Sequence, residues 1–116
     1  MDAEEKQRFI RAKAVENESD PGARKILWSR HGITELVEER LGRGALENGL
    51  KQCEVIEDYP TLHRPLPDCL VLGWITPPRP FHAVLAIDEA NDRVLVVTVY
   101  RPSPEEWEDD CRTRRR

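Results

Sequence analysis

The stretch that decides the fold is Pro80–Pro102, PFHAVLAIDEANDRVLVVTVYRP. Two apolar runs rich in β-branched residues, Phe81–Ile87 and Val94–Tyr100, flank a short polar segment. This pattern predicts a β-hairpin. Because both runs are apolar at almost every position, we expect both strands to be covered on both faces and to lie at the centre of a sheet.

The residues before the hairpin predict two further strands. Cys53–Tyr59 and Asp68–Thr76 have the required β-branched and apolar residues, and a proline-containing loop, Thr61–Pro67, separates them. A stiff proline-rich connection, Thr76–Pro80, leads into the hairpin. Gly73, inside the second of these strands, indicates a bulge or a close approach of the backbone. We therefore expect a four-stranded, mainly antiparallel sheet joined in sequence.

Helices are expected to cover this sheet. Met1–Val15 predicts a short, loosely docked helix with a thin apolar face, and Glu16–Gly22 has the composition of a linker. Ser29 is a suitable N-cap for a helix that continues to about Leu41, and Ala45–Gln52 predicts a second short helix. The fold class is α+β: a helical extension with its linker, 1–22, followed by one domain, 23–116.

The C-terminal residues predict a third short helix of the domain. Ser103, Pro104 and Glu106 form a capping-box pattern, and Trp107 is expected to pin this turn to the body. Four arginines lie among residues 112–116. They are typical of a solvated tail, with phosphate contact as the alternative.

Composition limits the classes of function. The chain has 116 residues, 34% of them charged, and a net charge of −4, which argues against broad, non-specific binding of nucleic acids. No apolar run approaches the ~20 residues of a membrane span, and a signal-peptide pattern is absent, so we expect a cytoplasmic protein without membrane contact. Cys53 and Cys69 are expected to be buried thiols and Cys111 to be exposed.

The chemistry must come from a few polar residues on otherwise apolar elements. No metal-binding, phosphate-loop or dinucleotide motif is present, so neither a metal nor another cofactor is expected. The candidates lie on the predicted hairpin or on the predicted helix that Ser29 caps. They are His31, Arg40, His82, Thr98 and Tyr100. Arg40 is expected to be buried among apolar residues of its helix, and therefore to be paired or to face a cleft.

Thr98 and Tyr100 share one strand face because side chains alternate along a strand. Whether His82 joins them depends on the register of the hairpin. A two-residue turn at Ala90–Asn91 pairs Phe81 with Tyr100 and turns His82 to the other face, whereas a three-residue turn brings all three together. The sequence leaves both registers open.

A histidine, an arginine and a hydroxyl on one surface suffice for metal-independent RNA cleavage. The imidazole exchanges protons with the 2′-hydroxyl or the leaving oxygen, and the guanidinium stabilises charge on the phosphate. A tyrosine stacks on a base or donates a proton. The same residue types also form ordinary structural networks, so composition alone does not decide between the two.

Several short motifs resemble one family. They follow in order and share its spacing: Ser29–His31 before a helix, Glu57–Pro60, Cys69–Gly73, Phe81–Val84, Thr98–Pro102 and Trp107. From about Ile26 to Arg114 the chain is similar to the small bacterial domains called domain of unknown function family 4258. The resemblance implies a RelE/barnase-like fold related to RelE and BrnT ribonuclease toxins, with helices before an antiparallel sheet.

The same resemblance implies an antitoxin protein as partner and RNA as substrate, and it places His31, Arg40, His82, Thr98 and Tyr100 at the candidate site. Many members carry an arginine one turn after the helix histidine, where this chain has Glu35. The leading hypothesis is a toxin-like, metal-independent ribonuclease in which His82 or His31 exchanges protons, Arg40 binds phosphate and Tyr100 orients the RNA.

The rival hypothesis is a non-catalytic protein-interaction module on the same fold. It binds a partner, an antitoxin or a second copy of the chain in a homodimer, through an exposed sheet edge. The net charge and Glu35 favour this rival, whereas the histidine and tyrosine of the hairpin favour the enzyme.

Overall fold

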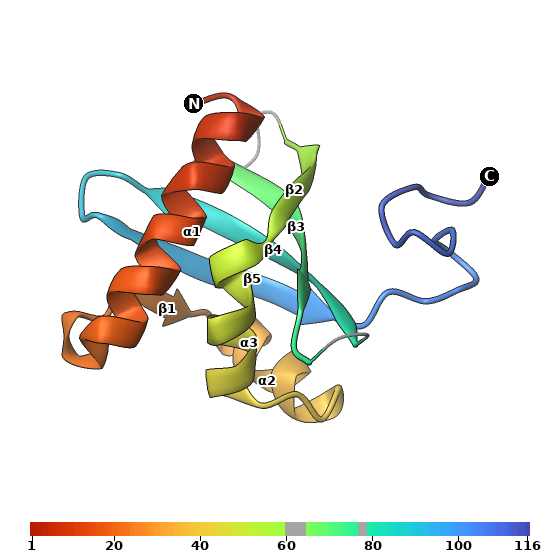
Figure 1. Cartoon of the computed structure of the whole chain (residues 1–116), viewed down its shortest axis with the longest axis horizontal. Helices are drawn as coiled ribbons and strands as arrows, with labels where there is room; N and C mark the ends of the chain where they lie inside the picture. The colour runs from red at the N-terminus through yellow and green to blue at the C-terminus, as the bar shows by residue number, and fades with distance from the viewer. Residues whose placement is uncertain (60–64, 77–78) are drawn as a thin grey trace.

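The structure is a computed structural model that describes residues 1–59, 65–76 and 79–116. Its centre is the predicted hairpin, which forms β4 (Pro80–Asp88) and β5 (Arg93–Tyr100). Nearly all of β4 is buried, as its unbroken apolar sequence requires. The predicted α+β class and the central place of the hairpin are confirmed (Figure 1).

Across the described residues the sheet has five strands, not four, in the order β1-β5-β4-β3-β2. β2 (Glu54–Asp58) and β3 (Asp68–Trp74) are the two strands predicted before the hairpin. The additional strand is β1 (Ile26–Trp28), which pairs parallel with β5, so the sheet is mixed. A run of three apolar residues is too short to show the alternation that marks a strand, and its partner β5 lies far away in the sequence. The fifth strand was therefore not predicted.

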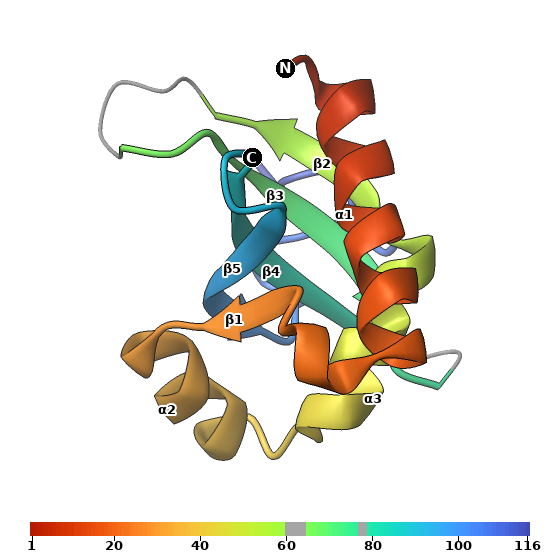
Figure 2. The same cartoon turned by 90° about the vertical axis from the view of Figure 1, so that its left-hand side faces the viewer.

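One face of the sheet is covered by helices. These are α1 (Ala3–Ser19), α3 (Arg43–Gly49) and the 3-10 turn η2 (Leu50–Gln52), and Figure 2 shows α1 lying along this face. The core between the layers contains Ile10 and Leu46, both fully buried, and the ring of Phe81.

The expectation of a short, loosely docked first helix is wrong. α1 continues through most of the predicted linker, and a 3-10 turn, η1 (Pro21–Ala23), follows it. Its thin apolar face is supplemented by Lys6 and Lys13, which are almost fully buried and form ion pairs with Asp58 and Asp92. The aliphatic stems of these lysines add buried surface that a count of apolar residues misses.

α2 (Arg30–Glu38) begins where it was predicted to begin. The Ser29 hydroxyl accepts a hydrogen bond from the Gly32 N–H and donates one to the Val97 carbonyl, which ties the helix start to β5. The helix ends at Glu38, before Leu41, and α3 starts at Arg43 rather than at Ala45.

Gly73 is a place of close approach by a side chain, rather than the bulge or backbone approach that the sequence predicted. A Cβ atom built at Gly73 would lie 2.4 Å from Cζ of the Phe81 ring, so the ring occupies the space that a side chain would fill. The irregularities of the sheet lie elsewhere, in β2 and in the central hairpin.

Residues 102–116, which we call the C-terminal strap, cross the face of the sheet opposite α1 (Figures 1 and 2). Trp107 is almost fully buried there against Leu70 and Val84, so the prediction that it pins this segment is confirmed. The predicted C-terminal helix is wrong: Ser103 caps only one turn, and Trp107 then forms a β-bridge with Arg114. This pairing draws the chain back on itself and prevents further helical turns.

Other predictions have mixed outcomes. Cys53 and Cys69 are buried thiols, as expected, and Cys111 is partly exposed. Residue 60, residues 61–64 of the predicted loop and residues 77–78 of the proline-rich connection lie outside the described residues. Among the described residues, no helix is long and apolar enough to cross a membrane.

Candidate functional site

The hairpin register brings His82, Thr98 and Tyr100 to one face of the sheet. Near the turn, Asp88 pairs with Arg93, which is the register of a two-residue turn. A bulge at β5 then shifts the register by one residue, so that His82 lies opposite Tyr100 and Val84 lies opposite Thr98. An extra residue inside the strand, rather than at the turn, therefore unites the three side chains.

His82 is fully buried on this face, beneath the C-terminal strap. Its Nε2 lies 2.7 Å from the carbonyl oxygen of Cys111, and its Nδ1 lies 3.3 Å from the Tyr100 hydroxyl. Because a carbonyl only accepts, Nε2 carries the proton and Nδ1 of the neutral ring accepts from the tyrosine. The Trp107 ring meets the imidazole edge-on at 4.4 Å between centroids.

Burial dominates the electrostatics of this pair. It lowers the pKa of His82, although the hydrogen bond to Cys111 and the charge of Glu57 act in the opposite direction. Burial also raises the pKa of Tyr100. Both side chains are thus held neutral near pH 7, and the strap keeps His82 from any solute.

The strap is held to β2 by two arginines. Arg112 donates two hydrogen bonds of 2.9 Å to Glu54, and Arg114 donates two, of 2.7 and 3.1 Å, to Glu57. These bonds lower the pKa of both carboxyl groups. The Arg114 guanidinium also lies 4.6 Å from the centroid of the Trp107 ring, a cation–π contact.

A second polar cluster joins α2 to β5. The Oε1 atom of Glu35 accepts hydrogen bonds from the Thr98 hydroxyl and, at 3.0 Å, from the Val99 N–H. Nε2 of His31 lies 3.2 Å from the same oxygen, one helical turn away. The His31 side chain is 68% exposed, whereas that of Glu35 is only 21% exposed. An anchored carboxylate therefore orients an imidazole whose Nδ1 has no hydrogen-bond partner among the described residues.

The two clusters are neighbours. Thr98 and Tyr100 point to the same side of β5, and the charge of Glu35 contributes to the raised pKa of Tyr100. His31 is the most open part of these two clusters, Thr98 and Tyr100 are partly exposed, and His82 is sealed.

The structure does not bring Arg40 into these clusters. α2 ends before it, and Arg40 adopts a left-handed conformation with φ 55° and an exposed side chain, so the expected burial is wrong. The helix that separates it from His31 puts the two residues at opposite ends, roughly 13 Å apart. The geometry of α2 therefore does not support a phosphate contact shared by His31 and Arg40.

Arg40 comes directly before Leu41, which lines a hollow that the sequence did not reveal. A pocket of about 270 Å³ lies at this end of the molecule, lined by Leu41, Ile75, Arg79, Pro80, Arg101 and Pro102. In the part of the chain that the structure describes, the side chains of Arg40, Arg79 and Arg101 form no ion pair or hydrogen bond. Two of these unneutralised cations, Arg79 and Arg101, thus line the pocket, and Arg40 adjoins it along the chain.

The chemistry of the described residues does not provide a metal site. Among residues 1–59, 65–76 and 79–116, no group of three or more histidine, cysteine, aspartate or glutamate side chains could hold a metal ion.

Comparison with known proteins gives a family. The sequence model of a domain of unknown function, DUF4258, matches residues 28–101. The chain belongs to this family. The match contains His82, Tyr100 and the cluster that joins α2 to β5, and it leaves α1 and the C-terminal strap outside, so it is shorter than the resemblance had indicated. No curated protein and no solved structure matches, and the likeness to RelE and BrnT toxins stays a prediction.

Proposed function

We propose that this DUF4258 domain is a metal-independent, toxin-like endoribonuclease in which His31 is the acid–base residue and Glu35 orients it. The observation that supports this proposal most directly is the open imidazole of His31, 3.2 Å from a carboxylate that β5 anchors. His82, the other histidine in the hypothesis, is sealed from solvent and has both ring nitrogens engaged.

The proposed reaction uses the free nitrogen of this imidazole. Nε2–H of neutral His31 donates to Glu35, which leaves Nδ1 as the acceptor for the proton of an RNA 2′-hydroxyl. The 2′-oxygen then bonds to the adjacent phosphorus as the bond to the 5′-oxygen breaks, and the leaving 5′-oxygen takes a proton from solvent water, which yields a cyclic phosphate and a 5′-hydroxyl end. The Glu35 carboxylate stabilises the imidazolium that forms.

In this proposal, the arginines without ion-pair partners bind the RNA substrate. Arg40, Arg79 and Arg101 would contact RNA phosphates away from the cleaved one, since they lie near the far end of α2. Because the net charge of the chain is −4, the rest of the surface repels RNA, and binding is limited to RNA that lies along these arginines. An antitoxin protein that covers His31 would keep such an enzyme inactive.

The test is cleavage of single-stranded RNA by the purified full chain in the presence of EDTA. We expect His31→Ala to lower the cleavage rate by about 10²- to 10⁴-fold, the usual contribution of a general base. Thr34→Ala, on the same helix and exposed, is the matched control and should cleave like the parent. Equal rates for His31→Ala and the control would contradict the proposed site.

The second candidate function is the non-catalytic interaction module, and the sealed state of His82 favours it. One of the two sheet edges that such a module could use is partly closed, because the Val55 N–H of edge strand β2 donates to the Gln7 side chain at 2.9 Å. A parent chain that neither cleaves RNA nor arrests bacterial growth on induction would leave this module as the better function.

A further inference from the structure

We propose that the sheet face carrying His82 is a docking site for a partner polypeptide that presents a tryptophan and two arginines. The C-terminal strap is the intramolecular occupant of that site. This binding function is separate from RNA cleavage, and it does not depend on His31.

The face offers an apolar seat for an aromatic side chain. Trp107 packs on Leu70 and Val84 and loses nearly all of its exposure, and the edge of the His82 ring closes one side. Tryptophan in such a seat is the usual anchor of a protein–protein contact.

The rim of the seat selects for arginine. Glu54 and Glu57 each receive a two-pronged guanidinium from the strap, and their lowered pKa values keep them ionised at neutral pH. With the strap removed, two carboxylates would border an apolar patch. Such a surface attracts a basic segment and repels RNA.

The buried imidazole adds a directional requirement. Nε2–H of His82 donates to a backbone carbonyl, that of Cys111, at 2.7 Å. Any occupant must therefore bring a carbonyl oxygen to this point or leave a buried donor unsatisfied.

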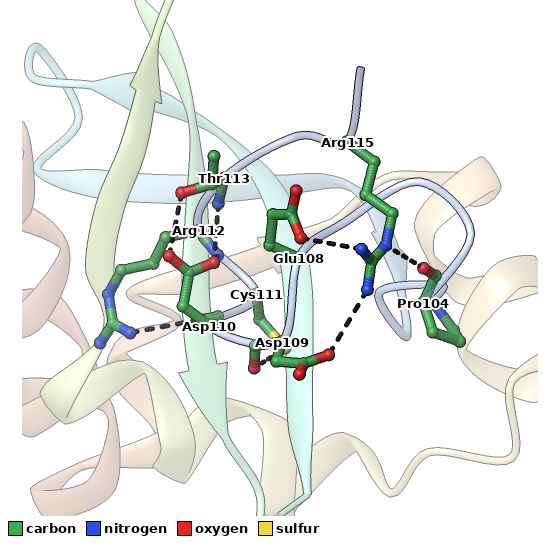
Figure 3. Close-up of polar contacts among 8 residues, drawn as sticks. All are labelled: Pro104, Glu108, Asp109, Asp110, Cys111, Arg112, Thr113 and Arg115. Carbon is green, nitrogen blue, oxygen red and sulfur yellow. Dashed lines mark hydrogen bonds and ion pairs between the residues drawn. The ribbon is translucent and has the colours of Figure 1, made fainter.

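The strap is held in shape by hydrogen bonds within itself, so a partner polypeptide can displace it as one unit. Figure 3 shows Asp110 accepting hydrogen bonds from Thr113 within the loop, and the Glu108 N–H donates to the Thr113 carbonyl at 2.7 Å. A cavity of about 360 Å³ lies beside Trp107 and is lined by residues of the strap, so the strap folds around a space of its own.

Its ionic links to the sheet are exposed. The side chains of Arg112 and Arg114 are 42% and 55% exposed, so solvent screens both pairs and a competing basic segment can reach the two carboxylates. The matched family range ends at residue 101, so the docking face lies inside the family domain and the strap lies outside it. A partner with the same groups can therefore compete for a site that is not part of the strap.

The experiment measures docking in trans on the full chain. A fluorescent peptide with the sequence of residues 103–116 is titrated with the parent and with the double variant Arg112→Glu/Arg114→Glu, and fluorescence anisotropy reports binding. We expect the double variant to bind the peptide about tenfold tighter or more, because the tethered strap competes at a high effective concentration in the parent.

Two controls separate docking from general charge effects. Arg8→Glu/Arg24→Glu has the same net charge, changes exposed arginines outside the strap, and should bind like the parent. A peptide in which the residue equivalent to Trp107 is alanine should not bind. Release of the strap is checked by the appearance of solvent exchange at the His82 imidazole in NMR spectra.

A folded double variant with a released strap that binds the peptide no better than the parent would overturn the proposal. If the double variant does not fold or keeps its strap docked, the Trp107→Ala variant, which lacks the anchor of the strap, is titrated in its place. Loss of RNA cleavage in any variant leaves this result unchanged, so the docking site and the proposed ribonuclease are tested independently.

Discussion

At the scale of single residues, Gly73 shows how tightly the sheet and its cover fit. The Phe81 ring lies where a Cβ atom of residue 73 would be, and Phe81 is fully buried, so the ring has no free space to move into. We expect Gly73→Ala to lower the free energy of unfolding by about 1–3 kcal/mol, the cost of overpacking a core.

Gly44→Ala is the matched control in urea denaturation. A Cβ atom at Gly44 meets no atom within 4 Å, and the residue is inside α3 with an ordinary φ. Alanine there should leave stability unchanged or raise it by up to ~1 kcal/mol through helix propensity. Equal effects of the two substitutions would show that the Phe81 ring adapts to a side chain at position 73.

Some of the candidate residues could be found from sequence because polar groups interrupt apolar runs. His82, Thr98 and Tyr100 were found in this way, but the bulge that unites them leaves no sequence signal. Glu35 was noticed only as a departure from the family pattern, and its anchoring by Val99 depends on how α2 lies along β5. The pocket beside Arg101 depends on segments far apart in the chain and could not be predicted.

At the scale of elements, α1 lies outside the family match yet packs as part of the core. Ile10 is fully buried against the sheet, whereas Val15 on the same helix is 50% exposed. We expect Ile10→Ala to lower the free energy of unfolding by about 2–5 kcal/mol, as for other large-to-small core changes. Val15→Ala should change it by at most ~0.5 kcal/mol.

Chemical denaturation of both variants checks this prediction. A parent-like midpoint for Ile10→Ala would mean that α1 is an accessory to an independently stable domain, as the sequence first indicated.

The elements that the sequence predicted correctly are those with long periodic or unbroken apolar runs. β4, β5 and α2 belong to this group. β1 was missed because three residues are too few for a pattern, and the C-terminal helix was wrong because its capping signal competes with the β-bridge between Trp107 and Arg114. In both cases a contact between distant residues overrides the local preference.

At the scale of the whole molecule, the stability of the fold should depend on the proton of His82. The pKa of a histidine in the unfolded chain is near 6.5, and burial lowers that of His82 in the folded protein. As the pH falls below 6.5, the unfolded state binds this proton more readily, so the free energy of unfolding decreases. The stabilising contribution is complete above about pH 6.5 and is lost as the pH falls through the folded pKa.

Urea unfolding between pH 7.5 and pH 5 measures this effect. The decrease in the parent should be absent in His82→Gln and retained in His31→Gln, whose side chain is exposed. Glu57 and Arg114 face His82 with opposite charges, and Glu57, with its lowered pKa, stays ionised throughout this window. A pH dependence that persists in His82→Gln would place the responsible proton elsewhere.

The parallel pairing of β1 with β5 has a consequence for synthesis on the ribosome. Ile26 is made early, but its partner Val94 follows every other strand of the sheet along the chain. The segment from β1 to α2 therefore emerges without its sheet neighbour and must wait, with apolar side chains uncovered, until β5 leaves the exit tunnel. A nascent chain stalled before that point would be a natural client for chaperones that hold exposed apolar segments.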